Sequence, residues 1–226
     1  MSEKRPAKKK GAPPVGLWLK VGPDLAIPEL LRDLKQIFFV INGSQYERNM
    51  HTLEVRGDAD DPEFRDKAAL LFEFARHNGI ACIFRGDPQI AKDIGADGVL
   101  AASPVGIDEA RKVFGADGII GLACGTSSEM AAAAHDAGAD FVSFGAANGQ
   151  LPGPEALRFW TILSDKPALV EGPLTNDYAA YFVQAGASFL DAGDYIWSHG
   201  KGVMQGTVNM LHAIDLALAE QREKKQ

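Results

Sequence analysis

Two arginines at the ends of strand-like segments are the residues best suited to bind a ligand. Arg56 ends an extended segment at residues 52–56, and Arg85 follows an apolar run at residues 80–84. A guanidinium group binds carboxylate and phosphate oxygens through paired N–H donors, without help from a metal ion. The alternative is structural, because each arginine can instead form a rim ion pair with an acid, the candidates being Asp58, Asp60, Asp87 and Glu171.

Few other side chains have the pattern of a reactive or metal-binding group. Asp87 is a candidate metal ligand, but it directly precedes Pro88 and is therefore also predicted to cap a helix. Cys124 lies in an apolar run with no histidine or lysine close by, which predicts a small buried side chain rather than a nucleophile. The two cysteines and five histidines show neither a disulfide framework nor a metal-binding spacing. Catalytic residues are not assigned.

The net charge of −7 is unevenly distributed along the chain. The first ten residues carry a local charge of +4, which leaves −11 for the remainder. An acidic body repels nucleic acid and anionic lipid, so neither is an expected partner. No apolar run approaches the roughly 20 residues of a membrane span. We expect a cytoplasmic protein that binds a small molecule and that can form homo-oligomers.

A recurring Gly-Ala-Asp pattern indicates repeated structural units. It occurs at residues 95–98, 115–118 and 138–140, and residues 186–188 have serine in place of aspartate. Internal periods of about 20 to 50 residues mark repeated supersecondary units. The glycine is typical of a helix end in the left-handed conformation, and the apolar run after each copy is typical of a buried parallel strand. The predicted strands from here on lie at 80–84, 99–101, 119–124, 141–144, 168–170 and 189–190.

Together with two further strands before residue 80, these six units predict a (β/α)8 TIM barrel. We expect a single domain at residues 15–220. Residues 1–14 are expected to be a disordered basic tail, and residues 221–226 a charged C-terminal tail. An open doubly wound sheet is the competing architecture, although the chain lacks its Gly-x-Gly-x-x-Gly turn. An amphipathic helix is predicted at 62–77.

The first two barrel strands are harder to place. We favour strands at 17–21 and 37–41, with residues 52–56 as a short added strand. The alternative makes 37–41 and 52–56 the first two strands. In either arrangement the carboxyl ends of the strands meet at one mouth of the barrel, where ligand sites of this fold are built.

Several segments between about residue 53 and residue 203 form a pattern known from other barrels, namely Val55-Arg56 and residues 90–99, 119–121, 137–145, 172–175 and 185–187. In these segments the chain resembles the thiamine phosphate synthase/TenI family of (β/α)8 barrels. The resemblance implies a transferase that joins an aminopyrimidine diphosphate to a thiazole phosphate, with loss of pyrophosphate and with Mg²⁺. It also implies that Arg56 contacts pyrophosphate. The candidate substrate- and phosphate-binding residues are then Arg56, Arg85, Gly172, Gly193 and Asp194.

The chain departs from the family pattern where the metal is held. The metal-binding Asn-Asp pair aligns with Arg85-Gly86, which leaves Asp87 one position late. The second metal acid is absent from residues 100–105, and no lysine occurs at residues 145–152 after the sixth strand. Mg²⁺ needs several oxygen ligands, so the resemblance implies the ion while most of its ligands are missing.

Acidic residues also replace neutral or basic residues at positions where the family binds its substrates. Glu54 and Asp58 stand where the family has glutamine and lysine, and Glu171 and Asp194 stand at the phosphate end. A carboxylate about 4 Å from a phosphate charge costs about 4 kcal/mol at an effective dielectric constant near 20. We therefore predict a synthase-like barrel that binds a small phosphorylated or heteroaromatic metabolite, in which the missing metal acids and lysine argue against the inherited synthase reaction. The alternative is a non-catalytic small-molecule-binding or regulatory barrel.

Overall fold

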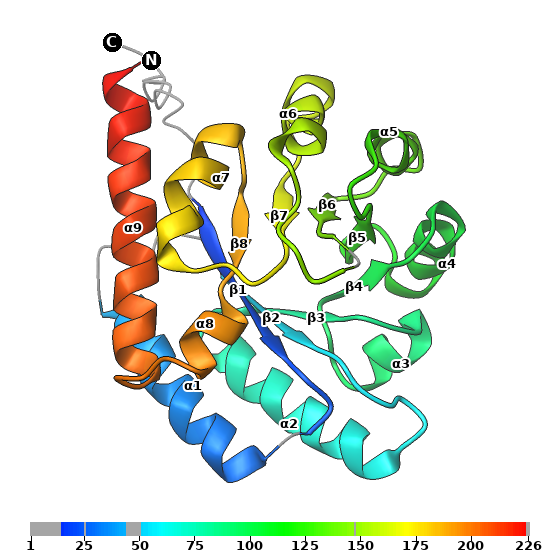
Figure 1. Cartoon of the computed structure of the whole chain (residues 1–226). Helices are drawn as coiled ribbons and strands as arrows, with labels where there is room; N and C mark the ends of the chain where they lie inside the picture. The colour runs from blue at the N-terminus through cyan, green and yellow to red at the C-terminus, as the bar shows by residue number, and fades with distance from the viewer. Residues whose placement is uncertain (1–14, 25, 44–50, 147, 225–226) are drawn as a thin grey trace, which may run out of the picture.

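The computed structural model of the chain describes residues 15–24, 26–43, 51–146 and 148–224. Eight parallel strands form a closed barrel in sequence order, and the last strand pairs with the first (Figure 1). The predicted single-domain TIM barrel is therefore confirmed, and the open doubly wound sheet is excluded. The strands are β1 (Gly16–Val21), β2 (Thr52–Val55), β3 (Ala81–Phe84), β4 (Gly98–Ala101), β5 (Ile119–Ala123), β6 (Phe141–Phe144), β7 (Ala168–Val170) and β8 (Phe189–Asp191).

Helices alternate with the strands and surround the barrel (Figure 1). They are α1 (Ile27–Asn42), α2 (Pro62–His77), α3 (Pro88–Asp93), α4 (Pro104–Phe114), α5 (Ser128–Asp136), α6 (Pro154–Leu163), the 3₁₀ helix η2 (Asn176–Tyr178), α7 (Ala179–Ala185), α8 (Gly193–Trp197) and α9 (Val203–Glu223). The helix predicted at 62–77 is confirmed as α2. In the described ranges, none of the helices has the length and apolar character needed to span a bilayer.

The expectation of a strand at residues 37–41 is wrong, because these residues lie inside α1. The buried side chains of α1 are Leu34, Ile37, Phe38 and Ile41, which is the spacing of one face of a helix. Phe39 is 73% exposed on the opposite side, and this outward aromatic residue makes the segment look uniformly apolar. The strand favoured at 17–21 is confirmed as β1, and the segment at 52–56, expected as a short added strand, is the second barrel strand β2.

Both predicted tails extend beyond the described residues. Residues 1–14 lie outside the described part of the chain, as do residues 225 and 226. The helix α9 continues to Glu223, so residues 221–223, which were expected to belong to the C-terminal tail, are helical.

Each Gly-Ala-Asp copy ends a helix in the predicted way. Gly95, Gly115, Gly138 and Gly186 have φ values of 78°, 73°, 77° and 106°, a region that residues with a Cβ avoid. The helix can therefore stop and turn into the next strand within a few residues.

The residue before each even-numbered strand accepts a hydrogen bond from the backbone of the preceding odd-numbered strand. This contact satisfies a strand N–H near the amino end of the barrel. The four contacts are Leu17 N to His51 Nδ1 at 3.1 Å, Cys82 N to Asp97 Oδ2 at 2.7 Å, Ile120 N to Asp140 Oδ2 at 2.8 Å, and Ala168 N to Ser188 Oγ at 3.3 Å. The aspartates at 97 and 140 and the serine at 188 thus tie pairs of strands together.

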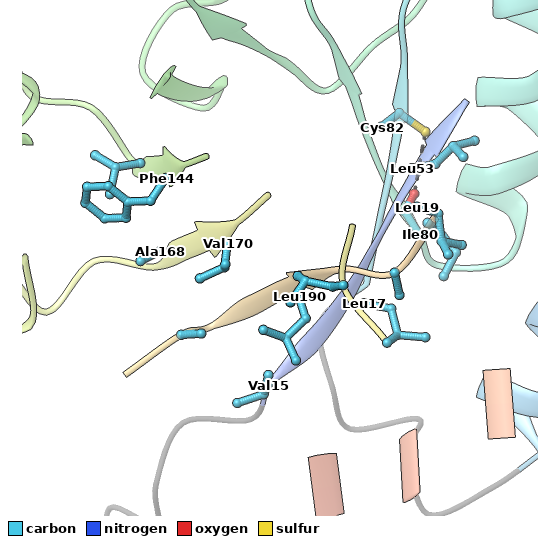
Figure 2. Packing of buried hydrophobic residues seen from close by; sticks show 14 of the residues in the cluster. Val15, Leu17, Leu19, Leu53, Ile80, Cys82, Phe144, Ala168, Val170 and Leu190 are labelled. Carbon is cyan, nitrogen blue, oxygen red and sulfur yellow. Dashed lines mark hydrogen bonds between the residues drawn. The ribbon is translucent and has the colours of Figure 1, made fainter. Parts of the chain in front are cut away.

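The strand side chains alternate between two apolar layers. One layer packs between the barrel and the helices, and Figure 2 shows Leu17 of β1 and Leu190 of β8 there on neighbouring strands. The other layer forms a separate cluster from the opposite positions of the strands, namely Trp18, Ile83, Leu100, Phe141, Leu169 and Phe189. The ring of Trp18 lies 5.3 Å from that of Phe141 and 5.5 Å from that of Phe189, centroid to centroid. These large rings fill the barrel interior and form a floor beneath the mouth.

Candidate functional site

A cavity of about 380 Å³ lies at the mouth formed by the carboxyl ends of the strands. Charged and polar side chains line it, namely Lys20, Arg56, Arg85, Ser143 and Glu171. The rest of the wall consists of small residues in and after β5, β6 and β7. A volume of this size suits a small metabolite.

The period of two along each strand explains why these side chains meet. Lys20 stands two positions after Trp18, Arg85 two after Ile83, and Glu171 two after Leu169. Alternate residues of a strand point to the same face, so a residue two places beyond an interior side chain also points inward, but nearer the mouth. The charged ring of the mouth is therefore the next layer above the apolar floor.

Four side chains converge on the carboxylate of Glu171. Its Oε2 accepts hydrogen bonds from Lys20 Nζ at 3.0 Å and from Arg56 Nη2 at 2.8 Å. Its Oε1 accepts one from Arg85 Nη2 at 2.8 Å and another from the hydroxyl of Ser143. The donors come from β1, from the residues after β2 and β3, and from β6. Glu171 thus joins both sides of the mouth.

A second carboxylate, that of Glu54, lies fully buried beneath the two arginines. Its Oε1 accepts hydrogen bonds from Arg56 Nε and from Arg85 Nε, the latter at 2.8 Å, and its Oε2 accepts one from Trp18 Nε1 at 2.6 Å. Each guanidinium therefore lies between two carboxylates, Glu54 on one side and Glu171 on the other. This pairing balances the charge of a buried acid and fixes both arginine side chains.

A third acid, Asp191, binds the lysine at the edge of this network. Its Oδ2 forms an ion pair with Lys20, and its side chain is only 5% exposed. Its two oxygens also accept long hydrogen bonds of 3.4 Å each from the backbone N–H groups of Gly172 and Gly193. Three cations and three carboxylates therefore face one another at the mouth.

Burial and pairing shift the pKa values of these groups in different directions. Burial lowers the pKa of Lys20, but Asp191 and Glu171 outweigh it and leave that pKa above its ordinary value. Burial raises the pKa of Glu171, but Arg85 and Lys20 hold it well below its usual range. Burial raises the pKa of Asp191 to about 6, against the opposing effect of Lys20. At neutral pH Lys20 is protonated, which suits binding rather than nucleophilic attack.

Comparison with known proteins assigns the chain to a family. A family model described as "Thiamine monophosphate synthase" matches residues 44–190. The chain is 33% identical over 153 residues to a thiamine-phosphate synthase from Rhodospirillum centenum, covering 64% of this chain and 74% of that protein. A thiamine-phosphate synthase from Hyphomonas neptunium is 31% identical over 154 residues, covering 65% and 70%. The chain belongs to the thiamine monophosphate synthase family.

Solved structures show the same fold at lower sequence identity. Thiamine phosphate pyrophosphorylase from Pyrococcus furiosus superposes with a TM-score of 0.70 and 18% identity, covering 89% of this chain and 96% of that one. A structure described as "Native KDPGal structure" superposes with a TM-score of 0.66 and 15% identity, covering 97% and 100%. These likenesses concern the barrel alone.

In this member of the thiamine monophosphate synthase family, Arg56 and Arg85 lie together at the mouth. Of the four acids proposed as their ion-pair partners, Glu171 pairs with both arginines. Their other partner, Glu54, was not among the acids proposed as ion-pair partners.

The remaining predicted residues lie around the mouth in different roles. Gly172 lines the cavity, Gly193 is buried, and the backbone N–H of each points to Asp191. Asp194 is exposed on α8. Asp87 caps α3, where its Oδ1 accepts the N–H groups of Gln89 and Ile90 at 2.8 and 3.0 Å, as predicted. Cys124 is buried, as predicted, and burial raises the pKa of its thiol to about 12.

The residues at the mouth do not fit the Mg²⁺ that the family implies. Glu54, Glu171 and Asp191 each bind a lysine or arginine, so a divalent cation near them would also lie near three fixed positive charges. Within the described ranges, no three His, Cys, Asp or Glu side chains gather as a metal site. We therefore derive no step through a metal ion.

Sequence reasoning missed Lys20, Ser143 and Asp191. Each follows an interior residue of its strand by two positions, so the alternation along β1, β6 and β8 was the available signal. Lys20 lies within the strand favoured at residues 17–21, so this signal was available there.

Proposed function

We propose that the chain binds a small phosphorylated or heteroaromatic metabolite in the mouth cavity and does not carry out the synthase reaction named for its relatives. The observation that carries this proposal is the paired-charge network itself. Both arginines use Nε and Nη2 to bind Glu54 and Glu171. Among the described residues, neither arginine's Nη1 has a hydrogen-bond partner, so both N–H donors of each Nη1 and the second N–H of each Nη2 are left for a ligand.

The wall of the cavity supports a flat ligand rather than a bulky one. Gly125, Gly145, Gly149 and Gly172 line it together with Ala123 and Ala146. Small side chains let a ring approach the backbone closely, and the two arginine Nη1 groups would hold acceptor atoms at its edge. A heteroaromatic ring with nitrogen or oxygen acceptors meets both conditions.

The loss of synthase activity follows from charge. Transfer with release of pyrophosphate produces a strongly anionic leaving group, which requires positive charge that is not already neutralised. The three cations at the mouth are balanced by Glu54, Glu171 and Asp191. The metal that would supply further positive charge has no fitting ligand set, as described above.

A retained synthase reaction is the second candidate. The names of the relatives from Rhodospirillum centenum and Hyphomonas neptunium favour it. The family resemblance, which implies that Arg56 contacts pyrophosphate, also favours it. The same network counts against it, because Arg56 is held by two carboxylates.

A coupling assay decides between the two candidates. The chain is incubated with the aminopyrimidine diphosphate and thiazole phosphate, with and without Mg²⁺, beside an Arg56→Ala variant and an Arg32→Ala control on the surface of α1. We expect no product in any reaction. Product formation that is lost in Arg56→Ala and kept in Arg32→Ala would establish the synthase reaction and overturn the proposal.

Binding is tested separately by thermal unfolding with thiazole, thiazole phosphate, thiamine and thiamine phosphate. We expect at least one of the four to raise the melting temperature of the wild type and of Arg32→Ala more than that of Arg56→Ala. If none of them does so, the proposed ligand class is wrong. The remaining expectations stay predictions: a cytoplasmic location, homo-oligomers, and partners that are neither nucleic acid nor membrane.

A further inference from the structure

The hydrogen-bond donors around Glu171 form the kind of site that normally holds a ligand anion. Lys20, Arg56, Arg85 and Ser143, here called the oxyanion cradle, come from four separate strands or strand ends. Each directs an N–H or O–H group to the same carboxylate, at 3.0, 2.8 and 2.8 Å for the three cations. Three positive charges and a hydroxyl converging on one point are a strong anion site.

The carboxylate of Glu171 fills this cradle completely. An ionised carboxylate has about four acceptor positions on its two oxygens. Each of the two oxygens of Glu171 accepts hydrogen bonds from two cradle donors, so all four donors are used. The side chain is only 12% exposed although it borders the cavity. It therefore occupies the cradle from the cavity side.

We infer that Glu171 is a built-in anion that takes the place of a ligand phosphate in the cradle and so selects against phosphorylated ligands at this position. The inference rests on the proposed function and narrows it to one ligand class. That class is the heteroaromatic one, with acceptor atoms for the arginine Nη1 groups and no phosphate at the cradle.

Electrostatics supports this selection. A phosphate that entered the cavity would lie beside the carboxylate of Glu171. The nearest positive charges are already paired with that carboxylate. A phosphate dianion near Glu171 would be repelled by it, and displacement of Glu171 would break four hydrogen bonds at once. A neutral ring meets neither obstacle.

Replacement of Glu171 tests the inference with simple anions. In Glu171→Ala the cradle loses its carboxylate and its three cations repel one another. Inorganic phosphate should then bind in the vacated place. At a phosphate concentration about 100 times its Kd, we expect the melting temperature of this variant to rise by about 5 °C or more. The wild type in the same buffer, with ionic strength matched by sodium chloride, should shift by less than about 1 °C.

A matched control separates the cradle from net charge. Glu109→Ala removes one exposed acid from α4 and changes the net charge of the chain equally, so it should respond to phosphate as weakly as the wild type. A double variant, Glu171→Ala with Arg56→Ala, should lose most of the phosphate response, because the cradle then lacks one of its guanidinium groups.

Two results would overturn the inference. Phosphate that stabilises the wild type as much as Glu171→Ala would show that the cradle is open with Glu171 in place. A Glu171→Ala variant that folds and does not respond would show that the donors form no anion site. If Glu171→Ala does not fold, Glu171→Gln replaces it in the same comparison. No thiazole or thiamine compound enters this measurement, so its outcome is independent of whether those compounds bind.

Discussion

The charged side chains of the mouth are largely buried, and they form ion pairs with one another. Glu54 is fully buried, and its two oxygens accept hydrogen bonds from Trp18, Arg56 and Arg85. A buried ion pair contributes little net stability, but removal of one partner leaves an uncompensated charge. Individual substitutions at the mouth should therefore affect folding as well as ligand binding.

Arg85→Ala should lower the free energy of unfolding by about 2 kcal/mol or more, because Glu54 and Glu171 each lose a guanidinium partner while they stay buried. Arg32→Ala, which removes the exposed ion pair with Asp33, should cost about 0.5 kcal/mol or less. Urea unfolding of both variants measures the difference. Equal losses would mean that the mouth network is no more important to stability than a surface pair.

The stability of the chain should also depend on Asp191 in mildly acidic solution. Burial raises its pKa from 3.8 to about 6, so the folded protein binds this proton more tightly than the unfolded chain does. The contribution of Asp191 to the free energy of unfolding therefore falls as the pH rises from about 4 to about 6. Glu171 has a lowered pKa and acts in the opposite direction, but only below its ordinary value of 4.5. Lys20, Glu171 and Glu54 are the charged groups that influence Asp191.

The measurement compares the wild type with Asp191→Asn, which cannot titrate at this position. Between pH 5 and pH 7, the free energy of unfolding of the wild type relative to Asp191→Asn should fall by about 1 kcal/mol. A difference that stays constant over this range would show that Asp191 has already lost its proton at pH 5.

At the residue scale, the sequence predicted some members of the site and not others. Arg56 and Arg85 stand out because a charge directly after an apolar run is visible in one segment. Glu171 stands out through the family pattern. Lys20 lies within a strand whose position was uncertain, and Asp191 gains its importance from Lys20, 171 residues away in the sequence. Contacts between distant segments become visible only once the strand order is known.

The elements of the barrel are tied in pairs by side chains at the amino ends of the strands. His51, Asp97, Asp140 and Ser188 precede β2, β4, β6 and β8 and bind the strands before them. The Gly-Ala-Asp pattern therefore has two functions, since its glycine ends a helix and its third residue joins two strands. Asp117, which precedes β5, is exposed and does not take part in this alternation.

Asp97→Ala should cost about 1–2 kcal/mol in free energy of unfolding, because the N–H of buried Cys82 would lose its acceptor. Asp117→Ala makes the same substitution in the neighbouring copy of the pattern. Its free energy of unfolding should stay within about 0.5 kcal/mol of that of the wild type. Asp97→Asn keeps an acceptor oxygen and should recover most of the loss. The alternation would be refuted if Asp97→Ala and Asp117→Ala unfolded at the same urea concentration.

The same pattern explains where the fold was predictable from sequence. From β3 onward, helix ends and strands follow one another at regular spacing, and every predicted strand is present. Before β2 there is no Gly-Ala-Asp copy to mark the strand start. Residues 37–41 then resemble a strand because outward-facing Phe39 interrupts the polar face of α1. A short apolar run does not distinguish a buried helix from a strand.

At the scale of the whole molecule, α9 packs beside the place where β8 meets β1. It contacts α7, which leads into β8, and α1, which follows β1 (Figure 1). Its inward residues include Met210, Leu211 and Ile214, all fully buried. The last helix therefore covers the join between the beginning and the end of the barrel.

Leu211→Ala should lower the free energy of unfolding by about 2–4 kcal/mol, since it creates a cavity in this contact. Leu216→Ala, on the same helix at a position that is 53% exposed, should change it by about 0.5 kcal/mol or less. Chemical unfolding of both variants provides the comparison. A small effect of Leu211→Ala would mean that α9 is dispensable for closing the barrel.

The balanced charges of the mouth also bear on how fast a ligand arrives. A binding site with a net charge speeds the association of an oppositely charged ligand, and added salt removes this effect. Here the mouth offers no such attraction, and the net charge of the chain is −7. An uncharged ring would therefore associate by unassisted diffusion, at a rate that is the same in dilute buffer and in concentrated salt.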